Sequence, residues 1–195
     1  MRRRTLLAGL VLAGSMTPTA VWAREAVAEL FGQAIYRDEL AEPEALGERI
    51  IQPLVQRFVD AQRLEPTETE IADVRAWMKD TMAQEGKEPI RASDASERQR
   101  LGELLAGIVL SWKINKALYE HYGGEVIFQQ FAPREAVGAM RQFLEDQEAS
   151  GTFKIFDAAE RERFYAYYRR RNHPGGFVPP EKVDYSVPWW RQKPR

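Results

Sequence analysis

The feature that most constrains this fold is a long helical segment, Leu101–Tyr122, which is closed by the pair Gly123-Gly124. Its nine residues from Leu104 to Trp112 include no charged side chain. A helix that buries only one face carries charges every third or fourth residue, so this run is predicted to be covered on more than one side. It is much shorter than the roughly 20 apolar residues that cross a bilayer. We therefore expect a core helix around which the shorter segments pack.

The first 23 residues have the three parts of a secretory signal peptide. Arginines at positions 2–4 precede a short apolar run, Leu6–Ala13, and Val21-Trp22-Ala23 supplies a cleavage site. The apolar run is too short for an anchor. We predict export to the periplasm, cleavage after Ala23 and no stable transmembrane segment afterwards. Arg3-Arg4 followed by two leucines also fits the twin-arginine pattern, so the export route stays open.

Removal of this segment leaves residues 24–195, a length typical of one domain. The chain contains no cysteine, so its core must form without disulfides even in a compartment that permits them. The remaining 25 basic and 29 acidic side chains give a formal net charge of −4. This balance argues against a nucleic-acid-binding protein, which normally carries a basic excess.

The N-terminal part predicts a hairpin followed by a helix. Val27–Phe31 and Ala34–Tyr36 are short apolar pieces that flank Gly32, as in a two-stranded hairpin. Arg49–Leu64 carries apolar residues at three- and four-residue spacing, which predicts an amphipathic helix. Pro53 either starts this helix or kinks it.

Three later helices are predicted from capping patterns, in which a Thr or Asp precedes a Glu by three positions and accepts an otherwise unpaired amide hydrogen. The three pairs are Thr67 with Glu70, Asp94 with Glu97, and Asp157 with Glu160. They open a helix that fades by Gly86, the central helix, and a helix that runs to Arg171. Another helix is predicted to start at Pro133 and to stop at Gly151.

The predicted fold is mainly α: a single helical domain around a long central helix, with a short N-terminal β-hairpin and one or two short extended segments. The extended segments are EVIFQQF, residues 125–131, and TFKIF, residues 152–156. Residues 173–195 are rich in proline and aromatic residues and are expected to be irregular and packed on the domain. The parts of the domain are then residues 24–92, 93–172 and 173–195.

Residues 26–82 resemble the N-terminal region of SurA-like periplasmic chaperones. The resemblance rests on Gly32-Gln33-Ala34-Ile35-Tyr36-Arg37-Asp38-Glu39-Leu40 and on Leu64-Glu65-Pro66-Thr67-Glu68-Thr69-Glu70-Ile71. The chain departs from the family at Phe31, where asparagine is usual, and at Pro53. Nothing after Gly123 resembles the family's parvulin isomerase domain. The resemblance implies a peptide-binding chaperone module without isomerase chemistry.

No catalytic constellation is recognisable, so an enzyme is the less favoured class. The two histidines, His121 and His173, are 52 positions apart, which does not suit a metal site, and no cofactor motif is present. The carboxylates of Glu145, Asp146 and Glu148 are better explained as a solvated helix face than as an acid–base pair.

Several other polar or aromatic residues admit two interpretations. Asn115, Gln129 and Gln130 lie in apolar stretches and are either functional amides or buried groups that fix packing, and packing is favoured. The tyrosines at positions 165, 167 and 168 with Arg169–Arg171 suggest base stacking, but an amphipathic helix with a basic last turn is the simpler account.

Trp77, Met78 and Met82 form the best candidate for peptide binding, because methionine beside an aromatic ring adapts to varied apolar segments. The competing interpretation is that these residues face the central helix as core.

We expect an exported, non-catalytic chaperone-like protein whose partners are unfolded or extended polypeptides. The alternative is a structural or accessory subunit of an envelope complex that docks through its C-terminal aromatic segments. A peptidyl-prolyl isomerase is the least favoured possibility. The sequence does not specify the client or the oligomeric state.

Overall fold

The computed structural model describes residues 24–42, 45–88, 94–129 and 134–192. Within these ranges the chain is mainly α, as the sequence predicts, with five α-helices and a three-stranded sheet in which a third strand is added to the predicted hairpin. The predicted signal peptide lies outside the described residues. None of the helices in these ranges is long and apolar enough to cross a membrane.

The sheet brings together the start of the described chain and a segment from its second half. β1 (Ala26–Leu30) and β2 (Gln33–Tyr36) form the predicted hairpin, and β3 (Phe153–Ile155) pairs antiparallel with the other edge of β1. In the turn, Phe31 and Gly32 have φ of 53° and 78°. Two positive φ values in a two-residue loop produce a twist that matches the strands.

After a 3-10 turn, Arg37–Glu39, the chain enters α1 (Ala45–Gln62), which confirms the predicted amphipathic helix. Its buried residues include Ile50 and Leu54, four positions apart. Pro53 lies inside this helix, so the alternative in which it starts the helix is wrong. Its ring removes the amide hydrogen that would bond the carbonyl one turn earlier.

α2 (Glu68–Gln84) begins with the predicted capping box. The Thr67 hydroxyl accepts the Glu70 amide at 3.3 Å, and the Glu70 carboxylate accepts the Thr67 amide at 2.8 Å. The same carboxylate accepts Lys113 Nζ at 3.1 Å, which ties the start of α2 to the central helix. Although burial opposes it, these hydrogen bonds hold the pKa of Glu70 below its usual value.

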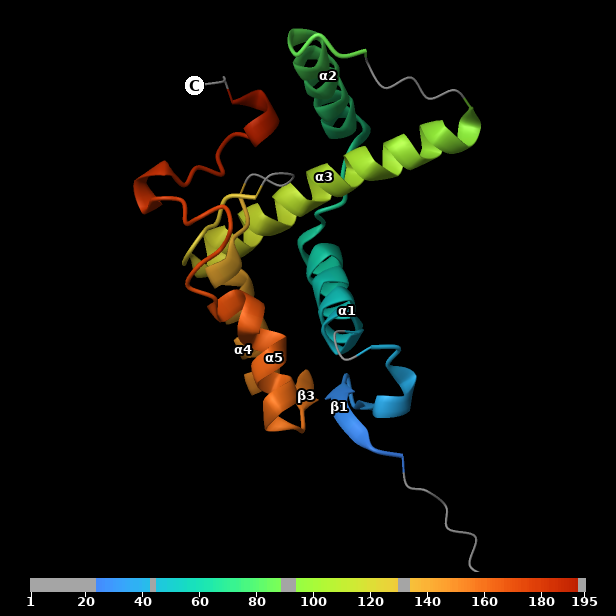
Figure 1. Ribbon diagram of the computed structural model, residues 1–195, viewed down its shortest axis with the longest axis vertical. Coiled ribbons are helices and arrows are strands. Elements are labelled where there is room, and N and C mark those ends of the chain that lie inside the picture. The colour runs from blue at the N-terminus through green and yellow to red at the C-terminus, as the bar shows by residue number, and fades with distance from the viewer. Residues whose placement is uncertain (1–23, 43–44, 89–93, 130–133, 193–195) are drawn as a thin grey trace, which may run out of the picture.

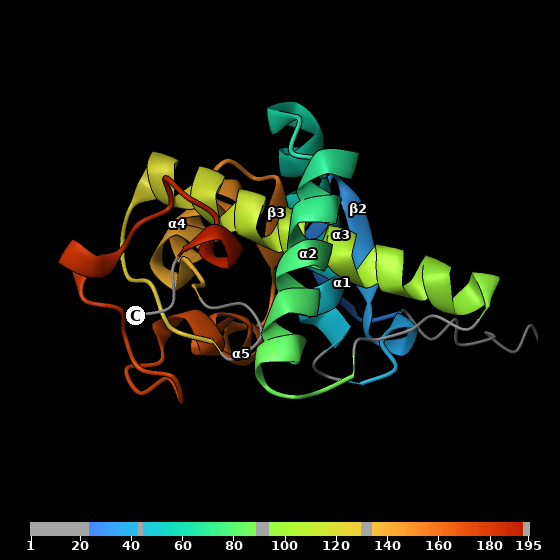
Figure 2. The ribbon, with the colours of Figure 1, turned by 90° about the horizontal axis from the view of Figure 1, so that it is seen from above.

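α3 (Ala95–Tyr122) is the predicted central helix, and the carboxylate of its cap, Asp94, accepts the Glu97 amide at 2.8 Å. It runs across the molecule, with α2 on one side and α1 and α4 on the other (Figure 1). Seen from above, α2 crosses over α3 (Figure 2). Leu105 and Val109 are fully buried, but Leu104 is 55% exposed. The uncharged run is thus covered less completely than predicted.

Two separate apolar cores lie on opposite sides of α3. The main core joins the sheet, α1, α4 and α5, and its buried members are Val27, Ala28, Leu30, Ile35, Leu46, Ile50, Leu54, Leu118, Val126, Ala136, Ala139, Phe143, Leu144, Phe153, Ile155, Phe164, Tyr165 and Tyr185. The small core joins α2, α3 and the C-terminal tail, and its buried members are Val74, Leu105, Val109 and Trp190.

The predicted start of a helix at Pro133 is wrong, because α4 (Val137–Ala149) begins four residues later. Pro133 itself lies outside the described residues. Glu135 is instead held in an antiparallel bridge with Ile127: the Ile127 amide donates to the Glu135 carbonyl at 2.9 Å, and the Glu135 amide donates to the Ile127 carbonyl at 3.0 Å. Gly138 lets this segment pass close to α4, since a Cβ there would lie 2.4 Å from the Glu125 amide nitrogen.

α5 (Ala158–Arg169) starts at the predicted cap, where the Asp157 carboxylate accepts the Glu160 amide at 2.8 Å. It ends two residues before the predicted end at Arg171. The C-terminal tail then follows an irregular path that contains the 3-10 turns Pro180–Lys182 and Trp189–Arg191. Tyr185 and Trp190 are each only 5% exposed, so the tail completes both cores.

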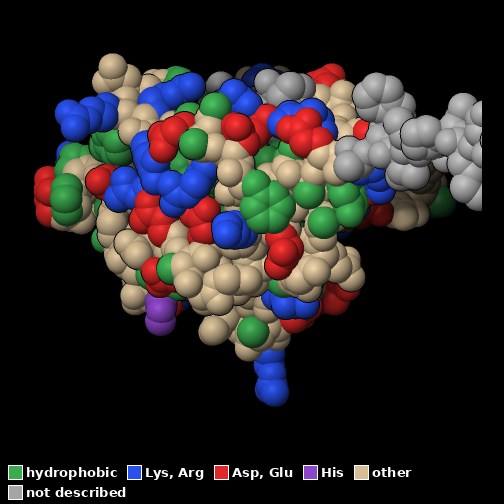
Figure 3. Space-filling view, turned by 90° about the horizontal axis from the view of Figure 1, so that it is seen from below, with side chains coloured by type: hydrophobic (Ala, Val, Ile, Leu, Met, Phe, Trp, Pro, Cys, Tyr) green, Lys and Arg blue, Asp and Glu red, His purple; other side chains and the backbone are tan. Residues whose placement is uncertain are grey.

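Acidic and basic side chains are mixed on the face shown in Figure 3. Between α5 and α4, Arg161 donates to Glu148 at 2.7 Å. Interspersed charges of this kind are typical of a solvated surface.

Candidate functional site

The three residues predicted to bind peptides lie on α2, and each is half-buried. Trp77 and Met78 pack against the small core, while Met82 lies one turn further along the helix. Part of the Trp77 and Met78 side chains is therefore buried by packing against the small core. The rest of each side chain stays accessible.

The C-terminal tail supplies the ring that covers Trp77. The Trp189 ring meets the Trp77 ring edge-on at 4.7 Å, and the neighbouring Trp190 meets Trp112 of α3 edge-on at 5.6 Å. Consecutive residues of a 3-10 turn point in different directions, so two adjacent indoles reach two helices. An ion pair between Arg191 and Asp73 of α2 fixes the end of the turn.

An apolar groove opens on the other side of Trp189. It is a cavity of about 230 Å³ lined by Leu104, Gly107, Ile108, Ser111, Trp112, Arg134 and Trp189. Leu104, at its outer edge, is one of the large apolar side chains that the structure leaves more than half exposed. Arg134, the one charged residue of the lining, donates to the Asp184 carbonyl and to Gln192 and thereby holds the tail. The apolar groove can receive an apolar side chain.

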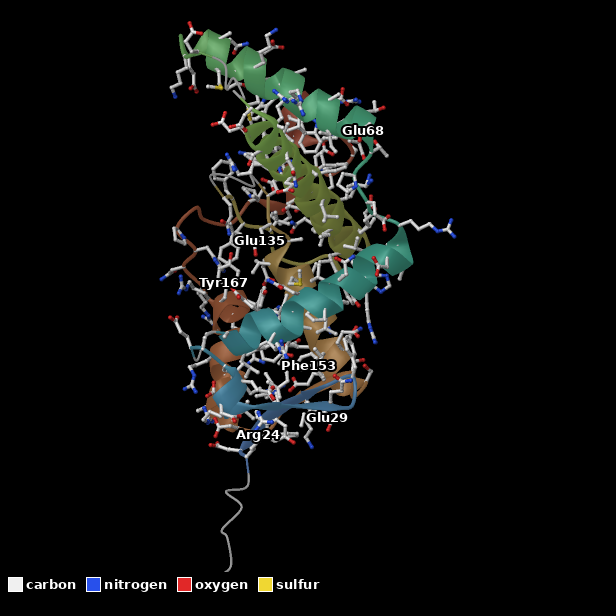
Figure 4. The ribbon with its side chains drawn as sticks, turned by 90° about the vertical axis from the view of Figure 1, so that its right-hand side faces the viewer. Arg24, Glu29, Glu68, Glu135, Phe153 and Tyr167 are labelled. Carbon is white, nitrogen blue, oxygen red and sulfur yellow. The ribbon has the colours of Figure 1, made fainter. Side chains whose placement is uncertain are left out.

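A second cluster of interest is polar and joins the 127–135 segment to α5. Figure 4 shows Glu135 and Tyr167 side by side, and the Tyr167 hydroxyl donates to the Glu135 carboxylate at 2.6 Å. The Gln129 amide donates to both, at 2.6 Å to the Tyr167 oxygen. Because the bridge with Ile127 fixes the backbone of Glu135, the carboxylate is presented to α5 in one orientation.

The central interaction of this polar cluster is a hydrogen bond from a protonated phenol, Tyr167, to a carboxylate, Glu135. Burial and the Glu135 carboxylate both raise the pKa of Tyr167, so its hydroxyl stays a donor at neutral pH. His173 lies against the Tyr167 ring at 5.3 Å and is only 6% exposed. Neither ring nitrogen of His173 has a hydrogen-bond partner within the described ranges. The hydrogen bonds of the cluster tie the 127–135 segment to α5.

Two of the three amides that the sequence left with two interpretations, Asn115 and Gln129, have hydrogen-bond partners. Asn115 is buried, accepts the Ala136 amide at 2.7 Å and donates to the Ser111 carbonyl at 2.8 Å, which confirms its packing role. Gln129 belongs to the polar cluster, and Gln130 lies outside the described residues. Glu135 was not singled out from the sequence. The only available signal was an acidic residue close to an apolar run that already contained Gln129.

Across the described residues, no group of three or more His, Cys, Asp or Glu side chains is placed to hold a metal ion. His121 is exposed at the end of α3 and contacts the Tyr122 ring, whereas His173 is buried beside α5.

No protein-family profile, no curated protein and no solved structure matches this chain. The resemblance of residues 26–82 to SurA-like chaperones therefore stays a prediction.

Proposed function

We propose that the protein is an exported, non-catalytic chaperone-like protein that binds unfolded or extended polypeptide segments in the periplasm. The observation that carries this proposal is the apolar groove on α3, with Leu104 exposed at its edge. Its volume of about 230 Å³ is below the roughly 300 to 1,000 Å³ of small-molecule pockets, so a client side chain suits it better.

The predicted binding residues extend this surface. Trp189 separates the apolar groove from Trp77 and Met78, because its ring lines the groove on one side and contacts Trp77 on the other. The tail turn that carries Trp189 is held on α2 by an exposed ion pair, Arg191 with Asp73, and by Trp190, which is buried in the small core beside Val74. Exposed ion pairs contribute about 1 kcal/mol or less. A client segment that displaces only the half-buried Trp189 ring, while Trp190 stays in the small core, would gain contact with Trp77, which lies on α2 with Met78 and Met82.

The experiment is suppression of aggregation of an unfolded outer-membrane protein, together with binding to a peptide array. Leu104→Asp places a charge at the groove edge and should weaken peptide binding about tenfold, the loss of roughly 1.4 kcal/mol of apolar contact. Phe156→Asp is the matched control, because Phe156 is 47% exposed but lies outside the groove.

Absence of both suppression and peptide binding at stoichiometric excess would rule out the chaperone function. Equal losses of peptide affinity in Leu104→Asp and Phe156→Asp would show that the apolar groove is not the binding site. If Trp189 covers part of the client-binding surface, Met78→Ser should weaken peptide binding more in the Trp189→Ala background than in the unmodified protein.

A second candidate function is an accessory subunit that docks on an envelope protein. It is supported by Phe128 and Phe177, which are 52% and 45% exposed on neighbouring extended segments joined by a bond from the Phe128 amide to the Gly176 carbonyl at 3.1 Å. Removal of the whole tail would also delete buried Tyr185 and Trp190, so a double variant, Phe128→Ser with Phe177→Ser, is the cleaner test. Loss of a co-purifying partner with an unchanged circular dichroism spectrum would favour docking.

A further inference from the structure

A second hollow of about 420 Å³ lies where α5 ends, beside the start of α4 and the tail. We call it the arginine pocket, and the residues of its lining that matter here are Arg141, Tyr168, Arg169, Arg170, Arg171 and Phe177. It shares no residue with the apolar groove and does not depend on the proposed function.

The arginines of this pocket are only partly neutralised. Arg141 lies 3.6 Å from Glu125, and Arg169 pairs with Glu145 at 3.4 Å and with Glu162 at 3.2 Å. Arg170 and Arg171 form no ion pair within the part of the chain that the structure describes. Two guanidinium groups with unused donors therefore border one hollow, in a chain whose formal net charge is −1.

The helix dipole at the C-terminus of α5 does not explain why all of these arginines lie beside the pocket. A cation in the last turn of a helix is stabilised by the helix dipole, and Arg169 occupies that position. The dipole effect falls off within the last turn. Arg170 already has extended backbone angles, φ −65° and ψ 129°, and Arg171 lies beyond it. The helix dipole therefore accounts for Arg169 but not for Arg170 and Arg171.

Two of the remaining lining residues, Tyr168 and Phe177, are aromatic, and Glu125, which faces Arg141, and Val137 complete the lining. The tail segment that carries Phe177 is held by two backbone bonds, Phe128 amide to Gly176 carbonyl at 3.1 Å and Val178 amide to Val126 carbonyl at 2.8 Å. Burial raises the pKa of Tyr168 to about 12, so its hydroxyl remains protonated at neutral pH. An apolar or aromatic group can lie against these rings while its charged end meets the arginines.

We propose that the arginine pocket binds a phosphate monoester group attached to an apolar or aromatic body. Two unpaired guanidinium groups match the charge of such a phosphate, which approaches about −2 at neutral pH. The planar fork of arginine donates two parallel hydrogen bonds to phosphate oxygens. A volume of about 420 Å³ falls within the roughly 300 to 1,000 Å³ of small-ligand sites. A soluble phosphorylated compound and a lipid phosphate headgroup share this chemistry.

The test is calorimetric titration of the purified protein with phenyl phosphate, inorganic phosphate and benzoate. Phenyl phosphate should bind most tightly, because it alone supplies both the charge and the ring. The double variant Arg170→Gln with Arg171→Gln should weaken its binding at least about tenfold, since each charge-assisted hydrogen bond is worth roughly 1.5 to 3 kcal/mol. Arg98→Gln, which removes an exposed arginine of α3 outside the pocket, should leave the affinity within about twofold.

A second arm separates the two sources of phosphate. Vesicles that contain phosphatidic acid, compared with vesicles of phosphatidylcholine alone, should bind the protein and lose it to phenyl phosphate if the ligand is a lipid headgroup. Binding of phenyl phosphate without vesicle binding assigns the site to a soluble compound. Circular dichroism of the double variant checks that it is folded, which is expected because both arginines are exposed.

Three outcomes would overturn the proposal. The first is absence of saturable binding of both phosphate ligands to the unmodified protein. The second is benzoate binding as tightly as phenyl phosphate, which would reduce the site to a carboxylate site. The third is an equal loss of affinity in Arg98→Gln and in the double variant, which would show a general charge effect.

Discussion

The two cores on either side of α3 differ in where their residues come from. The main core has eighteen buried members from the sheet, α1, α3, α4, α5 and the tail, and β1 and β3 join distant parts of the chain within it. The small core has four, and one of them, Trp190, comes from the tail. A core with few members loses a larger fraction of its contacts when one is removed. We therefore infer that the α2 side of the molecule opens at lower free energy than the sheet side.

The proposed function depends on this difference in opening free energy between the two sides of α3. The apolar groove and the predicted residues Trp77, Met78 and Met82 all lie on the side of the small core. Segments that rearrange to accept ligands belong to the less stable part of a protein. The main core can keep α3 rigid while the half-buried Trp189 side chain moves and Trp190 stays in the small core.

The largest expected effect comes from truncating one leucine of α3 in each core. Leu118→Ala removes a fully buried side chain from the main core and should lower the free energy of unfolding by about 4 kcal/mol. Leu105→Ala makes the same change in the small core and should cost only about 2.5 kcal/mol, because that site can collapse toward the neighbouring groove. Urea denaturation measures both. Equal costs would contradict the proposed difference.

The next effect concerns the link between the tail and α2. Trp190→Ala should lower the free energy of unfolding by about 3 kcal/mol, the low end for such a truncation, because the buried indole N–H has no partner within the described ranges. Hydrogen exchange should speed up in α2 more than in α4 or α5. Uniform acceleration in all helices would show that the two sides unfold as one unit.

A smaller effect is expected from pH on the main-core side. Glu160 is 6% exposed, and its pKa is lowered by the hydrogen bond from Arg163 and, against the effect of burial, by that from Arg37. A carboxylate whose pKa is lower in the folded state stabilises the fold at neutral pH and loses this effect as pH falls through the folded pKa. Glu160→Gln should cost about 2 kcal/mol at pH 7 and much less at pH 3. A constant cost across this range would rule out the ionic contribution.

The smallest expected effect tests whether the start of α2 can fray while the rest of the fold stays intact. Thr67→Ala removes the cap hydroxyl and should cost about 1 kcal/mol. Thr69→Ala, an exposed change in the same turn without a cap role, is the control and should be nearly neutral. Limited proteolysis should detect fraying of α2 in Thr67→Ala alone.

Features of this fold that depend on neighbouring residues could be predicted from the sequence. The hairpin at Gly32, the caps Thr67, Asp94 and Asp157 and the central helix follow from spacings of a few residues, and the structure confirms them. These signals act through local hydrogen bonds and periodic burial, which leave a pattern in the chain.

The features that were missed depend on contacts between distant segments. Glu135 is in a bridge with Ile127, which in turn pairs with Phe177 fifty residues further on, so the helix predicted at Pro133 begins later. Trp190 fills the small core more than a hundred residues after Val74. Local propensity carries no information about such pairings, and the apolar groove and the arginine pocket are formed by them.

The placement of the indole rings has an optical consequence. All four tryptophans of the described residues lie in one chain of ring contacts, Trp77 to Trp189 at 4.7 Å, Trp189 to Trp190 at 5.4 Å and Trp190 to Trp112 at 5.6 Å. Trp77, Trp189 and Trp190 belong to the small core alone, and Trp112 contacts both cores. Tryptophan emission from these residues therefore reports mainly on the α2 side, whereas far-ultraviolet dichroism reports on every helix. A fluorescence melt that precedes the dichroism melt would record, in the unmodified protein, the α2 side opening while the remaining helices stay folded.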